Sequence, residues 1–202
     1  MLTESYQLRD IFNCDESGLP WNAELNRKKL SKKRVSVLFT VNADGSEKLP
    51  PSLDLLLDHA VSMVNLHCHW ICCSTTLFQC NKKSWMTQSI FEDWLENLNE
   101  VMARENRKIL LLLDNVSTHK EVKPMSNVKL HFLPVNTTSL LQPQDAGIIA
   151  ATKKRHKAKL MQNAVERSDA GVVNPFKCTL HESLQWLYEA WSEVSAQTIS
   201  NC

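Results

Sequence analysis

Residues 108–115, Lys-Ile-Leu-Leu-Leu-Leu-Asp-Asn, decide the fold of this sequence. The five consecutive apolar residues are bounded by charge, are too few for a membrane span and lack a helical period. They therefore predict a central strand that is covered on both faces. The strand ends at Asp114, and functional groups gather beyond the carboxyl ends of strands in open α/β sheets. Asp114 is thus the first candidate for chemistry, although a turn-capping role with Asn115 stays open.

Composition limits the class of protein. The chain has 202 residues, of which 43% are hydrophobic, so it can bury one sizeable core and is expected to form one domain. Its net charge of +1 gives no global attraction to a polyanion. Seven cysteines, an odd number, with no signal-peptide pattern before them indicate a soluble protein of a reducing compartment. No apolar run reaches membrane-spanning length, so we expect no membrane partner.

Two further strands are predicted in the first quarter of the chain. Residues 10–15 indicate a short strand that ends at Asp15, ahead of a turn at Gly18. Residues 35–41 are rich enough in β-branched and aromatic side chains for a second strand. The Asp44-Gly45 pair then predicts a hairpin turn, with a partner strand starting near Glu47.

Helical periodicity dominates the second half. Thr87 or Ser89 can cap a helix whose apolar positions recur up to Met102. Residues 128–133 indicate a strand parallel to its neighbour, and residues 145–165 a helix that starts after Pro143. A last amphipathic helix is marked by Leu180, Leu184, Leu187, Tyr188, Trp191 and Val194, and Ser195 signals a new helix start.

Positive charge is clustered in two runs. Six basic residues in eight suit phosphate contact or nuclear import: Arg27, Lys28, Lys29, Lys32, Lys33 and Arg34. The helix over residues 145–165 carries the second run: Lys153, Lys154, Arg155, Lys157 and Lys159. A solvated face is the alternative for both runs. As a DNA interface they would make mainly sequence-independent contacts, because no base-reading element accompanies them.

Three carboxylates are expected at neighbouring positions of the fold. Asp15 and Asp114 are expected at strand ends, and Asp145 at the start of the helix that follows the next strand. Like charges brought together in this way raise one another's pKa unless a cation neutralises them. Such a cluster predicts a hard divalent metal, Mg²⁺ or Mn²⁺. Two such ions about 3.5–4 Å apart support phosphodiester cleavage, which is nuclease chemistry.

The sequence contains four longer motifs: Ile-Phe-Asn-x-Asp-Glu-Ser-Gly at 11–18, Val-Asn-Ala-Asp-Gly-Ser-Glu-Lys at 41–48, Asn-Lys-Lys-Ser-Trp-Met-Thr at 81–87 and Leu-Leu-Asp-Asn-x-x-x-His at 112–119. Together they resemble the DDE superfamily endonuclease domain, and most of all its pogo and Tigger transposase group. A fifth, Leu-Pro-x-Asn-Thr-Thr-Ser-Leu-Leu-Gln-Pro-x-Asp at 133–145, resembles the third acidic motif of that group. The resemblance covers residues 10–51 and 81–202.

The resemblance implies a ribonuclease H-like α/β fold, a mixed sheet flanked by helices, over residues 10–202 after a lead segment at residues 1–9. It implies that Asp15, Asp114 and Asp145 are the catalytic, metal-binding triad, with His119 as an orienting group. It further implies a nuclear protein that binds DNA, with metal-dependent cleavage and strand transfer as the ancestral reaction, and it allows a homodimer. The alternatives are a host-adopted protein that binds DNA or other partners without cutting, and an inactive remnant.

Residues 52–80 do not match the family, and the chain stops inside an expected helix. A frameshift is one explanation, because moving the codons of residues 67–71 by two nucleotides gives Leu, Pro or Ser, Leu, Asp, as in the family; a diverged insertion is the other. The crowded cysteines and histidines there lack the two spaced pairs of a structural zinc site. A frameshift predicts a disturbed third strand, low stability and little or no cleavage.

Overall fold

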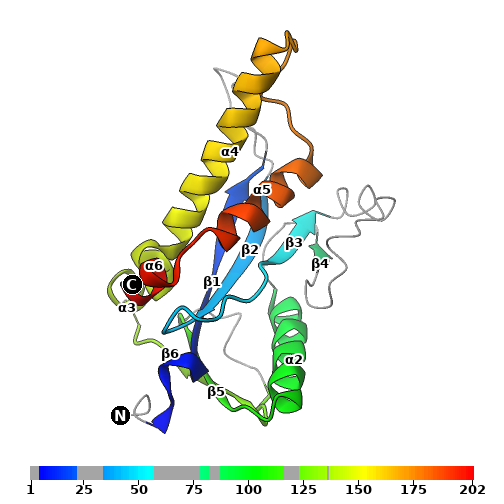
Figure 1. Ribbon diagram of the computed structural model, residues 1–202. Coiled ribbons are helices and arrows are strands. Elements are labelled where there is room, and N and C mark those ends of the chain that lie inside the picture. The colour runs from blue at the N-terminus through cyan, green and yellow to red at the C-terminus, as the bar shows by residue number, and fades with distance from the viewer. Residues whose placement is uncertain (1–4, 22–33, 57–77, 82–86, 116–122, 136) are drawn as a thin grey trace.

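The computed structural model describes residues 5–21, 34–56, 78–81, 87–115, 123–135 and 137–202. Within them the core of the fold is a six-stranded sheet with the order β4-β3-β2-β1-β5-β6 (Figure 1). The strands are β1 (Ile11–Pro20), β2 (Arg34–Asn42), β3 (Ser52–Leu56), β4 (Phe78–Asn81), β5 (Ile109–Leu113) and β6 (Val128–Phe132). β2 runs antiparallel to both of its neighbours, and the other adjacent strands pair in parallel. The predicted mixed sheet is therefore confirmed.

The apolar strand predicted within residues 108–115 is β5. Ile109, Leu110, Leu111 and Leu113 are all fully buried, as a strand covered on both faces requires. β5 lies between β1 and β6, so it is an interior strand. The middle of the sheet, however, belongs to β1 and β2, and the expectation of a central position was wrong in this respect.

β1 is longer than predicted. The strand expected over residues 10–15 continues to Pro20, and Gly18 pairs with Ser36 instead of forming a turn. The cause is β2, which pairs with β1 along its whole length from Phe12↔Asn42 to Pro20↔Arg34. Asp15 therefore lies in the middle of a strand.

The hairpin turn predicted at Asp44-Gly45 is present. Gly45 has a φ of +73°, and the Asn42 N–H donates to the Glu47 carbonyl at 3.0 Å. The returning chain forms a bridge between Val41 and Lys48 and continues as β3, which pairs with β2 from Ser52 onward. The third strand thus forms. The predicted loss of its side-chain pattern concerns side chains that are not among the described ones. Residues 57–77 also lie outside the described part of the chain.

Helices cover both faces of the sheet. They are α2 (Gln88–Arg104), α3 (Thr138–Leu141), α4 (Ile149–Asp169), α5 (Leu180–Ser192) and α6 (Ala196–Ser200), with short turns η2 (Leu8–Asp10) and η4 (Gln144–Ile148). Phe91, Leu95 and Met102 of α2 pack against Phe12, Leu38 and β5 on one face. On the other face, Leu184, Leu187 and Trp191 of α5 pack against Val37, Phe39 and Val41 of β2. Figure 1 shows α4 beside α5, with its far end projecting beyond the sheet.

The helix boundaries follow from capping side chains. Thr87 Oγ1 accepts the Ile90 N–H at the start of α2, and Ser195 Oγ accepts the Thr198 N–H at the start of α6. Thr179 and Glu182 form a capping box before α5. The helix predicted over residues 145–165 is instead a wide π-helical turn, η4, followed by the longer helix α4. Among the described residues, no helix has both the length and the apolar character that crossing a bilayer demands.

Candidate metal and nucleic-acid site

Strand register brings two of the predicted aspartates level with each other. β1 and β5 pair from Ile11↔Leu110 to Asn13↔Leu112, and extending that register by two residues sets Asp15 opposite Asp114. Side chains alternate along a strand, and Phe12 and Cys14 pack on the α2 side. Asp15 therefore faces the side of η4 and α4. Only β5 ends at this level, so the expectation that both aspartates terminate strands was wrong for Asp15.

The other two aspartates, Asp145 and Asp114, both act on Asp15. Burial, followed by the nearby carboxylates of Asp145 and then Asp114, raises the pKa of Asp15 from 3.8 to about 7. The Glu16 N–H donates to Asp15 Oδ1 at 2.8 Å, which acts in the opposite direction. Asp145 lies in the first turn of η4. Asp15 is thus repelled by the charges of both other carboxylates.

The three carboxylates are not a ready coordination site. In the part of the chain that the structure describes, no three His, Cys, Asp or Glu side chains are close enough to share one ion. The donor chemistry nevertheless fits a hard divalent cation, because carboxylate oxygens are its preferred ligands and its charge would relieve the repulsion that acts on Asp15.

A network of three buried side-chain amides lies directly beside the aspartates. Asn13 Nδ2 donates to the Leu112 carbonyl at 3.1 Å and to Gln142 Oε1 at 3.0 Å, and Gln142 Nε2 donates to the Cys14 carbonyl at 3.2 Å. Asn13 Oδ1 accepts the Gln144 N–H at 3.2 Å. Gln144 Nε2 donates to the carbonyls of Asn13 and Phe39, both at 3.3 Å. We call Asn13, Gln142 and Gln144 the amide clamp.

Sequence reasoning missed the amide clamp although all three residues stand in the quoted motifs. The available signal was Asn13, an amide within the otherwise apolar start of β1. A polar side chain at such a position needs buried partners. The partners themselves could not be read from the sequence, because they lie about 130 positions further along the chain.

Lys153 is the member of the second basic run that lies at the aspartates. Its Nζ donates to Ser17 Oγ on β1 at 2.7 Å. Burial and then Arg34 lower the pKa of Lys153, whereas Asp145 and Asp15 raise it. Lys153 is therefore a partly buried cation between β1 and α4, close to two of the carboxylates.

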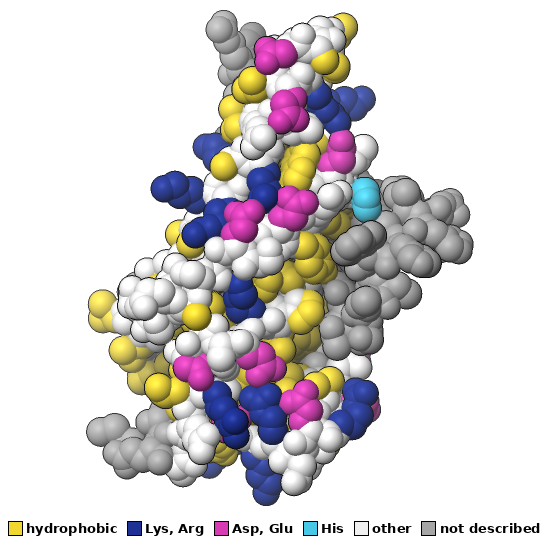
Figure 2. Space-filling view, viewed as in Figure 1, with side chains coloured by type: hydrophobic (Ala, Val, Ile, Leu, Met, Phe, Trp, Pro, Cys, Tyr) yellow, Lys and Arg dark blue, Asp and Glu magenta, His cyan; other side chains and the backbone are white. Residues whose placement is uncertain are grey.

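The other basic residues of the second run differ in their surroundings, and Figure 2 shows Lys and Arg side chains interspersed with Asp and Glu side chains on this face of the molecule. Lys154 and Lys157 are exposed. Arg155 Nη1 donates to the Ala151 carbonyl at 3.1 Å. Lys159 Nζ forms ion pairs with Glu189 at 3.1 Å and Glu193 at 2.8 Å on the α5 side. The run is thus no uniform cationic face.

Several predicted site residues cannot be placed. Of the first basic run only Arg34 is described, exposed at the start of β2; Arg27, Lys28, Lys29, Lys32 and Lys33 lie outside the described residues. His119 lies outside them as well, together with the cluster of cysteines and histidines at residues 67–73. Their predicted roles stay predictions.

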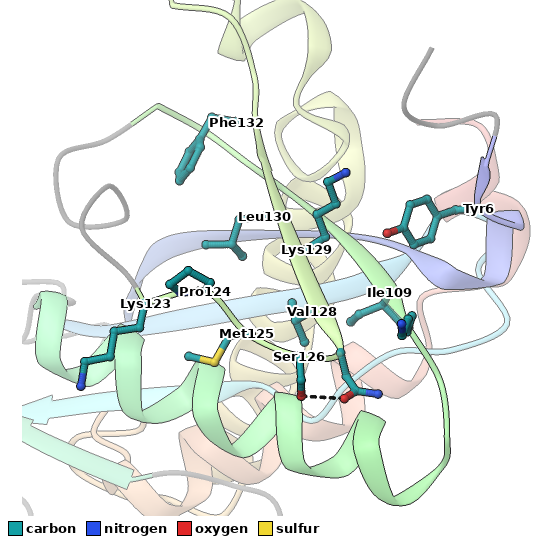
Figure 3. Close-up of a pocket in the computed structure, with 12 residues that line it drawn as sticks. Tyr6, Ile109, Lys123, Pro124, Met125, Ser126, Val128, Lys129, Leu130 and Phe132 are labelled. Atoms are coloured by element: carbon teal, nitrogen blue, oxygen red, sulfur yellow. Dashed lines mark hydrogen bonds between the residues drawn. The ribbon is translucent and has the colours of Figure 1, made fainter.

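A cavity of about 460 Å³ lies elsewhere, along β6 and the start of β5 (Figure 3). Its lining includes Tyr6, Lys108, Lys123 and Lys129. Asp15, Asp114 and Asp145 are not among its lining residues.

The sequence of this chain is similar to those of a known protein family. The sequence profile of the DDE superfamily endonuclease family matches residues 32–202. Tigger transposable element-derived protein 4 of Mus musculus is 26% identical over 96% of this chain and 39% of its own length. CENP-B homolog protein 2 of Schizosaccharomyces pombe is 29% identical over 100% of this chain and 42% of its own. The chain thus spans well under half of these relatives.

The fold has a counterpart among solved structures. This chain is similar in structure to the crystal structure of the Mos1 mariner paired end complex with Mn, with a TM-score of 0.56 at 11% identity. The match covers 99% of this chain and 53% of the Mos1 chain. The Mos1 strand transfer complex gives a TM-score of 0.53. The ribonuclease H-like fold expected from the sequence is thereby confirmed.

Proposed function

Because the chain belongs to the DDE superfamily endonuclease family, we propose that it is a transposase-derived domain that binds DNA and holds a divalent cation, Mg²⁺ or Mn²⁺, with Asp15, Asp114 and Asp145. The observation that carries the proposal is the proximity of these three carboxylates: strand register sets Asp15 level with Asp114, and the charges of Asp145 and Asp114 add to burial in raising the pKa of Asp15 to about 7. Isolated surface carboxylates have no such effect on one another, whereas metal-binding carboxylates do.

A bound Mg²⁺ or Mn²⁺ would supply a Lewis acid and activate water for phosphodiester cleavage. The residues of the chain bind and orient around it. Asp114 is carried by the rigid end of β5, and Asp15 is held in place by the β1–β2 pairing. Lys153, fixed by Ser17, provides a cation for the DNA phosphate at the carboxylates.

The second candidate is a DNA-binding protein that no longer cuts. It is favoured by one observation, that no three ligand side chains among the described residues are spaced to share an ion. A cation would then have to draw the carboxylates together, and a chain that cannot make this adjustment would bind DNA without cleaving it. Lys154 and Lys157, which are exposed, serve DNA contact equally well in both cases.

Cell location and assembly follow as part of the same proposal. A domain that acts on chromosomal DNA is expected in the nucleus. Its DNA contacts are mostly independent of sequence, because those that we assign use lysine side chains to reach phosphates. A homodimer is compatible with this function, and sedimentation of the purified protein with and without duplex DNA tests it.

Titration of the purified chain with Mn²⁺ in a calorimeter, followed by incubation with a labelled duplex, tests the proposal. We expect binding of Mn²⁺ that is lost in Asp15→Asn, Asp114→Asn and Asp145→Asn, and retained in Asp169→Asn, a control at the exposed end of α4. Metal-dependent nicking supports the endonuclease. DNA binding without nicking supports the second candidate, and absence of both Mn²⁺ and DNA binding contradicts the proposal.

A further inference from the structure

The most heavily hydrogen-bonded feature near the aspartates is the amide clamp, whose members are almost fully buried. Asn13 is 5% exposed, Gln142 1% and Gln144 0%. Burying an amide costs free energy unless its polar atoms find partners. Asn13 uses both polar atoms, and Gln142 does so through Asn13 and the Cys14 carbonyl. Three buried amides in mutual contact are therefore a specific arrangement rather than filler of an apolar core.

The contacts of the clamp join the segments that carry the three aspartates. Asn13 lies two residues before Asp15 on β1, and it donates to Leu112, two residues before Asp114 on β5. Gln142 and Gln144 precede Asp145 and connect η4 to β1 and to Phe39 of β2. Each aspartate thus has a clamp contact within two residues in sequence.

The bonding of Gln144 is asymmetric. Its Nε2 donates to two backbone carbonyls, on β1 and on β2, whereas its buried Oε1 has no partner among the described residues. A buried acceptor without a partner costs free energy. The side chain is nevertheless kept in the orientation that ties the start of η4 to two strands at once.

We propose that Asn13, Gln142 and Gln144 are positioning residues that fix the backbone carrying Asp145 against β1 and β5, so that the three carboxylates are held on neighbouring segments from which a divalent cation can draw them together. The expected effect on metal binding rests on the proposed function. The positioning of the backbone by the amide clamp is a property of the metal-free chain and can be tested without metal. Groups that orient ligands in this way typically change metal affinity about 10-fold to 100-fold when they are removed.

In the test, glutamine is replaced by methionine, which keeps the length of the side chain and removes its hydrogen bonds, and Asn13 is replaced by alanine. The variants are Gln142→Met and Asn13→Ala, singly and combined, with Gln162→Met on the exposed side of α4 as the matched control. We expect Gln142→Met to weaken Mn²⁺ binding at least about 10-fold at little cost in melting temperature. The double variant should lose less than the sum of the two single losses, because the Asn13–Gln142 hydrogen bond is removed by either change.

Hydrogen exchange of the metal-free chain separates the clamp from the proposed function. We expect Gln142→Met to speed exchange of the amides over residues 144–149 and to leave those of α2 unchanged, whether or not the wild type binds Mn²⁺. Exchange that rises throughout the chain would indicate a merely structural role and overturn the inference, as would unaltered exchange over residues 144–149. If the wild type binds no Mn²⁺ but the local change in exchange is seen, the proposed function fails and the clamp stands.

Discussion

Asp15 is a carboxylate held in the middle of a strand beside two other carboxylates. Its pKa is raised from 3.8 to about 7 by burial, Asp145 and Asp114. Between these two values the folded chain binds more protons than the unfolded chain. The contribution of Asp15 to stability is therefore most favourable at or below about pH 4, and it declines as the pH rises toward about 7. The ionised form of Asp15 thus lowers the stability of the metal-free protein at neutral pH, which the proposed cation would offset.

Asp15→Asn tests this balance in metal-free protein. At pH 8 we expect the substitution to raise the melting temperature by several degrees, since each kcal/mol is worth roughly 2–4 °C in a domain of this size. Near pH 4 the gain should vanish, because Asp15 is then protonated in the folded state. Circular dichroism melts from pH 4 to pH 8 measure it. Asp44→Asn is the control of opposite sign, because hydrogen bonds from Ser46 lower the pKa of Asp44. A lower melting temperature of Asp15→Asn at pH 8 would contradict the argument.

Between elements, Arg107 joins three segments that meet at the end of α2. It forms ion pairs with Asp10 before β1 at 3.1 Å, with Glu47 after the β2 turn at 3.0 Å and with Glu105 at 3.0 Å. These hydrogen bonds outweigh burial and raise the pKa of Arg107, so it stays charged. Only a planar guanidinium can satisfy three carboxylates in this arrangement.

Replacing Arg107 with lysine keeps the positive charge and removes the planar guanidinium that binds three carboxylates at once. We expect Arg107→Lys to lower the free energy of unfolding by about 1–3 kcal/mol, the range for charged hydrogen bonds. Urea denaturation measures the change. Arg104→Lys on the same helix, where the side chain reaches only the Glu100 carbonyl, should cost less than about 0.5 kcal/mol. Equal losses for the two variants would show that the ion pairs contribute nothing.

The turn between β2 and β3 rests against α6. A Cβ atom on Gly45 would lie 2.7 Å from the Ala196 carbonyl oxygen, and Gly45 has a φ of +73°. Gly171, after α4, has a φ of +74° with nothing within 4 Å of a Cβ. The two glycines thus share the same backbone conformation and differ in their neighbours.

This pair separates backbone strain from steric clash. Gly171→Ala should cost about 1–2 kcal/mol, the strain of a left-handed residue. Gly45→Ala should cost clearly more, because α6 must also move away from the turn. Chemical denaturation of both variants provides the comparison. If the two losses were the same, the turn would not rest on α6 as described.

At the scale of the whole molecule, the positive charges of α4 are divided between exposed side chains, to which we assign DNA contact, and internal ion pairs. Lys157 is exposed, whereas Lys159, two residues further on, is paired with Glu189 and Glu193. The two side chains project toward different neighbours because successive positions turn by about 100° around a helix. Counting lysines in the sequence would overestimate the number that reach phosphate.

Fluorescence anisotropy with a labelled duplex over a series of KCl concentrations tests this division. Lys157→Met should reduce the slope of log affinity against log salt by about one, the effect of one lost phosphate contact. Lys159→Met should leave the slope unchanged and cost at most about 1 kcal/mol of stability. A wild-type affinity that is independent of salt would exclude phosphate binding by this helix.

Local signals in the sequence were sufficient for much of the fold. The apolar run of β5, the turn at Gly45 and the caps at Thr87 and Ser195 each depend on residues a few positions apart, so each was predictable. The spaced motifs also identified the family, which the profile match over residues 32–202 bears out. The residue types of the three aspartates were enough to suggest a cation, and that suggestion stays a proposal.

The end of β1 was not predictable in the same way, because pairing with β2 carries the strand past Asp15 to Pro20. The amide clamp and the place of Lys153 depend on bonds between residues 129 and 136 positions apart, Asn13 with Gln142 and Ser17 with Lys153. No local pattern encodes such partners. The sequence by itself thus determined the family of this protein and most of its strands and helices, but not all of their bounds. Only the tertiary structure decided which polar side chains meet, because sheet register and helix packing set those distances.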